Sequence, residues 1–91
     1  MNKCKNKIPE AYRAGCERLG DVIAAVRRQQ RLSQEALAQK AMLSTRQLSN
    51  IETGQCNTSI ITLVKLAAAL QISVACLARA VDTGMYGRKT E

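Results

Sequence analysis

The sequence predicts one all-α domain made of five helices. Its 91 residues are 46% apolar, which is enough for one packed core and too few for two. Apolar residues recur at spacings of three and four, which is typical of one helix face. Three times, an apolar residue precedes a serine that is followed four positions later by leucine, a pattern typical of helix starts.

We expect the first helix to run from about Pro9 to Gln30. Proline suits the first helical position because it has no N–H to leave unpaired there. Gly15 and Gly20 lie inside this stretch and weaken the helical pattern. The apolar face of the helix is predicted to consist of Tyr12, Cys16, Leu19, Ile23 and Val26.

Serine caps mark the later helices. In each pattern the serine oxygen accepts from N–H groups of the first turn, and the apolar neighbours close over it. The patterns predict helices over about 34–40 and 45–53 and one after Ser73, and a fourth cap is expected at Ser59. The three patterns are Leu32-Ser33 with Leu37, Leu43-Ser44 with Leu48, and Ile72-Ser73 with Leu77.

The helices over 34–40 and 45–53 are short and are joined by only a few residues. Two helices connected so tightly must cross steeply, which predicts a helix-turn-helix. In this arrangement the second helix can enter the major groove of duplex DNA.

Composition excludes several functions. Net charge is +7, and His, Phe and Trp are absent. Without imidazole or aromatic platforms, acid–base catalysis and single-stranded nucleic-acid binding are disfavoured, whereas duplex DNA requires neither. The carboxylates are scattered and Cys56 has no base to activate it, so we expect no enzyme, metal, cofactor or small-molecule ligand.

The sequence predicts three segments: a basic arm over 1–8, a domain over 9–81 and a tail over 82–91. Lys3, Lys5 and Lys7 give the arm its charge, and a solvated tail without a partner remains an alternative. No CxxC pair, secretory signal or membrane-length apolar run is present. We therefore expect a cytoplasmic protein without a disulfide scaffold, in which Cys16 and Cys76 act as small apolar residues.

Three sequence motifs resemble those of the Cro/lambda-repressor-like helix-turn-helix family. They are the stretch Leu32–Ala38, then Leu43-Ser44 with Leu48–Gly54, and Ser59–Leu63 with Lys65–Leu70. The resemblance implies a compact five-helix, lambda-repressor-like domain that binds double-stranded DNA. It also implies a homodimer acting on a pseudo-palindromic operator.

The resemblance places Thr45, Arg46 and Asn50 at groove-facing positions, with Gln47 beside them. Arginine can pair with guanine, asparagine with adenine, and the threonine methyl can contact thymine, although each side chain could bind phosphate instead. Gln47 also completes an S-x-x-Q capping box with Ser44, so a cap and a base contact are both open for it.

The remaining site residues are assigned to phosphate contact or to support. Gln34 matches a family glutamine that contacts phosphate and braces the recognition helix over 45–53. Arg27 and Glu52 match an ion pair of the family that holds the same helix in place. Met42 stands where the family has glycine, and Thr58 where it often has proline, so the turn could differ there. Further phosphate contacts are expected from Arg28, Arg31, Lys40, Gln55 and Asn57.

Dimerisation is expected because one module of this size covers little DNA. Val74, Leu77 and Val81 are the predicted interface, and closure of the protomer's own core is the alternative reading. The leading function is a sequence-specific transcriptional regulator. Two alternatives are an antitoxin, which would add a toxin protein as partner, and a restriction–modification controller.

Overall fold

The computed structural model describes residues 10–55 and 58–86, and within them the chain forms five α-helices and no strand. The predicted all-α class and helix order are confirmed. Four boundaries agree closely with the sequence prediction. Ser33, Ser44 and Ser59 are each N-caps, and the last helix begins directly after Ser73, whose Oγ accepts from the N–H of Cys76 at 3.2 Å. The helices are α2 (Glu10–Gln29), α3 (Gln34–Lys40), α4 (Thr45–Glu52), α5 (Ile60–Leu70) and α6 (Val74–Tyr86).

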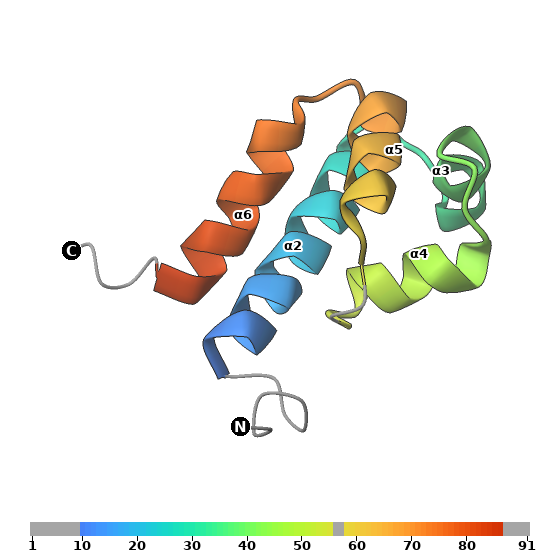
Figure 1. Ribbon diagram of the computed structural model, residues 1–91. Coiled ribbons are helices and arrows are strands. Elements are labelled where there is room, and N and C mark those ends of the chain that lie inside the picture. Colours follow the sequence, from blue (N-terminus) through green and yellow to red (C-terminus); the bar gives the residue numbers. More distant parts are fainter. Residues whose placement is uncertain (1–9, 56–57, 87–91) are drawn as a thin grey trace.

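All five helices contribute to one apolar core. Figure 1 shows α2 and α6 side by side and antiparallel, with α3, α4 and α5 on the other side of α2 in this view. Tyr12, which we expected on the core face of α2, is 53% exposed and lies outside the core. The largest fully buried side chains are Ile23, Leu37, Leu48, Leu66, Leu70 and Leu77.

The two glycines inside α2 do not break the helix but allow neighbours to approach it. A Cβ on Gly15 would lie 2.9 Å from Cγ of Met85, on α6. A Cβ on Gly20 would lie 2.5 Å from the carbonyl oxygen of Ile51 and 2.7 Å from that of Glu52. The end of α4 therefore packs directly on the backbone of α2.

Helix α6 continues beyond Val81, into the stretch predicted as a tail. Gly84 lies so close to α2 that a Cβ there would be 2.5 Å from the carbonyl oxygen of Ala14. Residues 82–86 are thus helical and packed against α2. The predicted arm over 1–8, and Pro9, lie outside the described residues.

Four helices end in the same way, with a left-handed residue. Arg31, Met42 and Gln71 have φ values of 60°, 59° and 61°, and Gly54 has 93°. In each case the next residue donates its N–H to a carbonyl five positions back, as Leu43 does to Ala38 at 2.8 Å. The left-handed residue itself donates to a carbonyl three positions back, as Met42 does to Gln39 at 3.2 Å, and the two bonds together satisfy the last carbonyls of the helix. Met42 therefore keeps the family turn conformation without the usual glycine.

The cysteines differ from expectation. Cys16 is disulfide-bonded, so it is not a reduced apolar residue as we predicted. Cys76 is a free thiol, but it is exposed on α6 rather than buried.

No single helix in the described ranges is long and apolar enough to cross a membrane. Helices α5 and α6 are long and apolar enough only when taken together, and they are bent by 118° at the break between them.

Replacing Met42 with glycine is expected to stabilise the protein by about 1 kcal/mol, because a left-handed conformation costs a residue with a Cβ roughly that much. Met42 is 79% exposed, so little packing is lost. Thermal unfolding should show a melting temperature higher by roughly 4–8 °C. As a control, Gln39→Gly inside α3 should destabilise the protein. A lower melting temperature for Met42→Gly would show that the left-handed conformation of Met42 is not strained.

Candidate nucleic-acid interface

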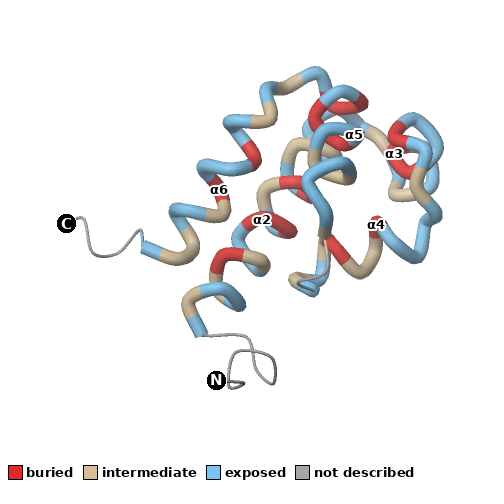
Figure 2. The backbone as a smooth tube through the Cα atoms, in the orientation of Figure 1, coloured by how far each residue is buried: buried red, intermediate tan, exposed pale blue. Residues whose placement is uncertain are grey.

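The start of α4 is the exposed part of the helix-turn-helix. Ser44 caps the helix, and the core-facing Leu48 and Ile51 hold it against the rest of the domain. Figure 2 shows the first turn of α4 exposed, whereas the rest of the helix is buried or half-buried. A helix fixed along its inner face thus presents its first turn to solvent.

The structure places the predicted base-reading residues together on this helix. Thr45 and Arg46 are exposed in the first turn, and Asn50 lies half-buried one turn further along. The guanidinium fork of Arg46 is therefore open to a ligand outside the protein. These residue types at an exposed helix start can supply hydrogen bonds to base edges in the major groove.

Gln47 forms the capping box that the sequence left as one of two readings. Its Oε1 accepts from the N–H of Ser44 at 3.1 Å, and its own N–H donates to Ser44 Oγ at 3.0 Å. The side chain is therefore folded back on its own helix. The cap is present, and a base contact by Gln47 remains only a prediction.

The end of α4 is fixed by the predicted ion pair. Arg27 donates from Nε to Oε2 of Glu52 at 2.8 Å and from Nη2 to Oε1 at 3.1 Å. The two side chains are only 12% and 5% exposed, so the pair is largely shielded from water. Hydrogen bonding to Glu52 raises the pKa of Arg27, which therefore stays charged.

Two further hydrogen bonds connect the Arg27–Glu52 pair to the linker before α3 and to α3 itself. Arg27 donates from Nη1 to the carbonyl oxygen of Leu32 at 2.8 Å, in the linker between α2 and α3. Gln34 donates from Nε2 to Oε1 of Glu52 at 2.9 Å. Gln34 thus braces α4, as the family resemblance implied, and its predicted phosphate contact remains untested.

The other phosphate candidates are spread over several helix ends. Arg28 is exposed in the last turn of α2, Lys40 is exposed at the end of α3, and Arg31 and Gln55 are exposed just after helices. Asn57 lies outside the described residues. The structure therefore leaves these four side chains available to an anionic partner.

Sequence reasoning missed a contact between the ends of two helices. Gln30 donates from Nε2 to the carbonyl oxygen of Leu70 at 2.7 Å, which satisfies the end of α5. No spacing rule identifies such a contact between residues 40 positions apart.

The predicted dimer residues do not form an exposed surface. Leu77 is 0% exposed within the single chain, and Val74 and Val81 are half-buried against the core. Leu77 lies in the protomer's own core, which is the alternative reading of this residue, and the position of a dimer interface stays a prediction. Exposed apolar side chains lie instead on α5, where Ile60 is 67%, Ile61 60% and Val64 48% exposed.

This arrangement of α3 and α4 defines a helix-turn-helix protein. The chain belongs to the helix-turn-helix family, because the model of that family matches residues 23–75, more than half of its length.

Relatives of known name are regulators rather than enzymes. The chain is 34% identical over 71 residues to an HTH-type transcriptional regulator, y4dJ, of Sinorhizobium fredii, which covers 78% of this chain and 92% of that protein. It is 41% identical over 59 residues to the immunity repressor protein of Bacillus phage phi105, which covers 65% of this chain. The chain matches only 41% of the length of this repressor.

A solved structure shares the fold. The restriction-modification controller protein C.AhdI from Aeromonas hydrophila superposes with a TM-score of 0.68 and 34% sequence identity. The similarity covers 70% of this chain and 97% of that protein. The family resemblance drawn from the sequence motifs is thus confirmed.

Glu52→Ala is expected to lower stability by about 3–5 kcal/mol, because it leaves the shielded guanidinium of Arg27 without its partner. It should also weaken binding to duplex DNA, since the end of α4 is released from α2 and α3. Thermal unfolding and DNA titration measure the two effects. The control Asp21→Ala removes an exposed carboxylate and should change little, and an unchanged melting temperature for Glu52→Ala would disprove the role of the pair.

Proposed function

We propose that the protein is a sequence-specific transcriptional regulator that binds double-stranded DNA in the cytoplasm as a homodimer on a pseudo-palindromic operator. The observation that carries this proposal is the exposed first turn of α4, where Thr45 and Arg46 project from a helix held by a shielded ion pair. A fixed helix with free polar side chains at its start has the geometry needed to read a major groove.

Charge supports an anionic partner of this kind. The chain carries a net charge of +7, and the exposed Arg28, Arg31 and Lys40 lie at the ends of α2 and α3, the helices that hold α4. Phosphate contacts from such residues position a protein on DNA without reading its sequence. In this proposal Arg46, Thr45 and Asn50 read bases, while these cations supply affinity.

We place the dimer contact on α5 instead of on Leu77. Ile60, Ile61 and Val64 form an exposed apolar face, and Lys65 is the only charged residue of this helix. Two strongly basic chains repel each other least where they meet through a nearly uncharged surface. A second copy of this chain is therefore the occupant that fits this face, and pairing two copies doubles the DNA surface covered.

A restriction–modification controller is the second candidate. The similarity to C.AhdI, which covers 97% of that controller protein, favours this more specific role. Selection of bound sequences from random duplex DNA tests the shared proposal, since it yields half-site, spacing and symmetry together. Failure of any sequence to be enriched would reject a sequence-specific regulator of either kind.

Arg46→Ala is expected to weaken binding to the preferred operator by about 1–3 kcal/mol and to relax the preference at one base pair. Arg28→Ala should weaken binding to all duplexes alike and reduce the salt slope by about one unit per contact, because fewer counterions are released. Binding selections and salt titrations on both variants measure these effects. Full wild-type base preference in Arg46→Ala would remove this residue from the reading set.

Sedimentation equilibrium is expected to show a dimer, with half-sites roughly 10 base pairs apart. Ile61→Asp should convert it to a monomer, because a charge would have to be buried in the apolar contact. Ala25→Asp, on an exposed part of α2, is the control and should remain dimeric. A wild-type mass of one protomer at high micromolar concentration would contradict the dimer.

A further inference from the structure

Two side chains at the C-terminal end of α2 hold the ends of two other helices. Arg27 donates from Nε to Oε2 of Glu52, at the end of α4, at 2.8 Å. Three positions further on, Gln30 donates from Nε2 to the carbonyl oxygen of Leu70, at the end of α5, at 2.7 Å. The N–H of Gln30 in turn donates to the carbonyl oxygen of Arg27 at 3.1 Å. The ends of α4 and α5 are therefore fixed to the same short stretch of chain.

The bond from Gln30 satisfies a carbonyl that the cap of α5 leaves over. The left-handed end of α5 uses the carbonyls of Ala67 and Ala68 as acceptors. The carbonyl of Leu70 has no partner within the helix, and Leu70 is 0% exposed, so solvent does not reach it. Buried carbonyls in folded proteins are nearly always paired. Gln30 therefore supplies the donor that the end of α5 requires.

The exposed apolar face of α5 lies toward the opposite end of this helix. Ile60, Ile61 and Val64 belong to its first half, whereas Leu66 and Leu70 enter the core in its second half. At the rise of an α-helix, Ile60 lies about 15 Å along the axis from Leu70. A small change in the direction of α5 at its bonded end is therefore enlarged at the apolar face.

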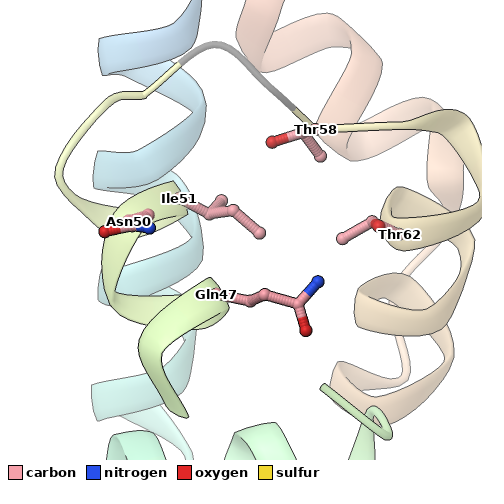
Figure 3. Close-up of a pocket in the computed structure, with 5 residues that line it drawn as sticks. All are labelled: Gln47, Asn50, Ile51, Thr58 and Thr62. Atoms are coloured by element: carbon pink, nitrogen blue, oxygen red, sulfur yellow. The ribbon is translucent and has the colours of Figure 1, made fainter. Parts of the chain in front are cut away.

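A cavity of about 80 Å³ lies between α4 and the start of α5. Figure 3 shows Gln47 and Ile51 extending from α4 toward Thr62 on α5, without filling this space. Contact with α4 thus supports the first half of α5 incompletely. Apolar packing of the second half has no preferred direction, whereas a hydrogen bond has a preferred angle. The bond from Gln30 is therefore suited to set the direction of α5 relative to α2.

We propose that Gln30 is a positioning residue that fixes the angle between the apolar face of α5 and the reading helix α4, and thereby sets the spacing of the operator half-sites. Arg27 fixes α4 on the same stretch of chain, so the two bonds together relate the reading helix to the dimer contact. In a two-fold dimer any change in this angle occurs in both protomers. One base pair more between the half-sites rotates them by roughly 34–36° relative to each other, so spacing is sensitive to this angle. The role rests on the proposed DNA binding and on the proposed dimer contact on α5.

Gln30→Glu tests the positioning in the free protein, because an ionised carboxylate has nearly the shape of the amide but no N–H to donate. Residual dipolar couplings of the backbone amides should show α5 reoriented relative to α2 and α4. Gln29→Glu makes the same change of charge on the exposed neighbouring residue and is the matched control, which should leave these couplings unchanged. Wild-type couplings for α5 in Gln30→Glu would overturn the proposal.

The wild-type protein gives a second test that does not depend on the folding of a variant. The side-chain amide of Gln30 is bonded to a buried carbonyl, so its hydrogens should exchange with solvent several-fold more slowly than those of Gln29. NMR measures both rates in one sample. Equal rates would show that the bond is not kept in solution, which contradicts the role of Gln30.

Operator binding tests the consequence for spacing. Wild-type protein should bind operators with half-sites one base pair closer or farther apart more weakly than the selected operator. Gln30→Glu should reduce this spacing penalty about two- to tenfold, the range that one hydrogen bond supports, and Gln29→Glu should keep it. A general loss of folded protein weakens binding to all operators alike and leaves the ratio unchanged. An unchanged ratio in Gln30→Glu would reject its role in spacing.

The two arms also separate this inference from the proposed function. Wild-type protein that selects no operator would reject the regulator, while reoriented α5 in Gln30→Glu would retain Gln30 as the residue that fixes α5, without a role in spacing. A selected operator, with α5 unchanged in Gln30→Glu, would retain the regulator and reject the positioning by Gln30.

Discussion

The carboxylate of Glu52 is the group on which the position of α4 depends. It receives N–H groups from two other helices, through Arg27 of α2 and Gln34 of α3. The same guanidinium also holds the linker between these helices through the carbonyl of Leu32. One cluster therefore sets three helices relative to each other. A shielded ion pair contributes little net stability compared with apolar packing, but it fixes one arrangement among several, which is what a reading helix requires.

The motif residues made this part of the structure predictable from sequence. The serine caps are recognisable as residue types at fixed spacings, so they predicted the helix starts directly, whereas the Arg27–Glu52 pair was predicted through the family resemblance. The left-handed ends of α2, α3 and α5 were not predictable in this way. Glycine is the usual signal of such an end, and these positions hold Arg31, Met42 and Gln71 instead. Their strain is offset by the paired helix-end hydrogen bonds and by partial burial of the next apolar residue, which are tertiary effects.

The apolar surfaces show a different limit of sequence reasoning. The sequence pattern groups Leu77 with Val74 and Val81 as an apolar set on α6, but it does not tell whether the covering surface belongs to the same chain or to a partner. The close packing of α6 on α2, made possible by Gly15 and Gly84, accounts for Leu77. Helix α5 is apolar on more than one face, so after Leu66 and Leu70 enter the core, Ile60 and Ile61 remain outside.

The choice among the base-reading residues is narrowed by local hydrogen bonding. Gln47 and Arg46 are neighbours, both are exposed, and composition does not separate them. The capping box distinguishes the two residues. It engages both the backbone and the side chain of Gln47 with Ser44, whereas the guanidinium of Arg46 can turn outward. The cap uses Oε1 and the backbone N–H of Gln47, and it gives the neighbouring residues a fixed backbone from which to contact a ligand. Thr45, Arg46 and Asn50 are the predicted reading residues outside the capping box, and a base contact by Gln47 stays a prediction.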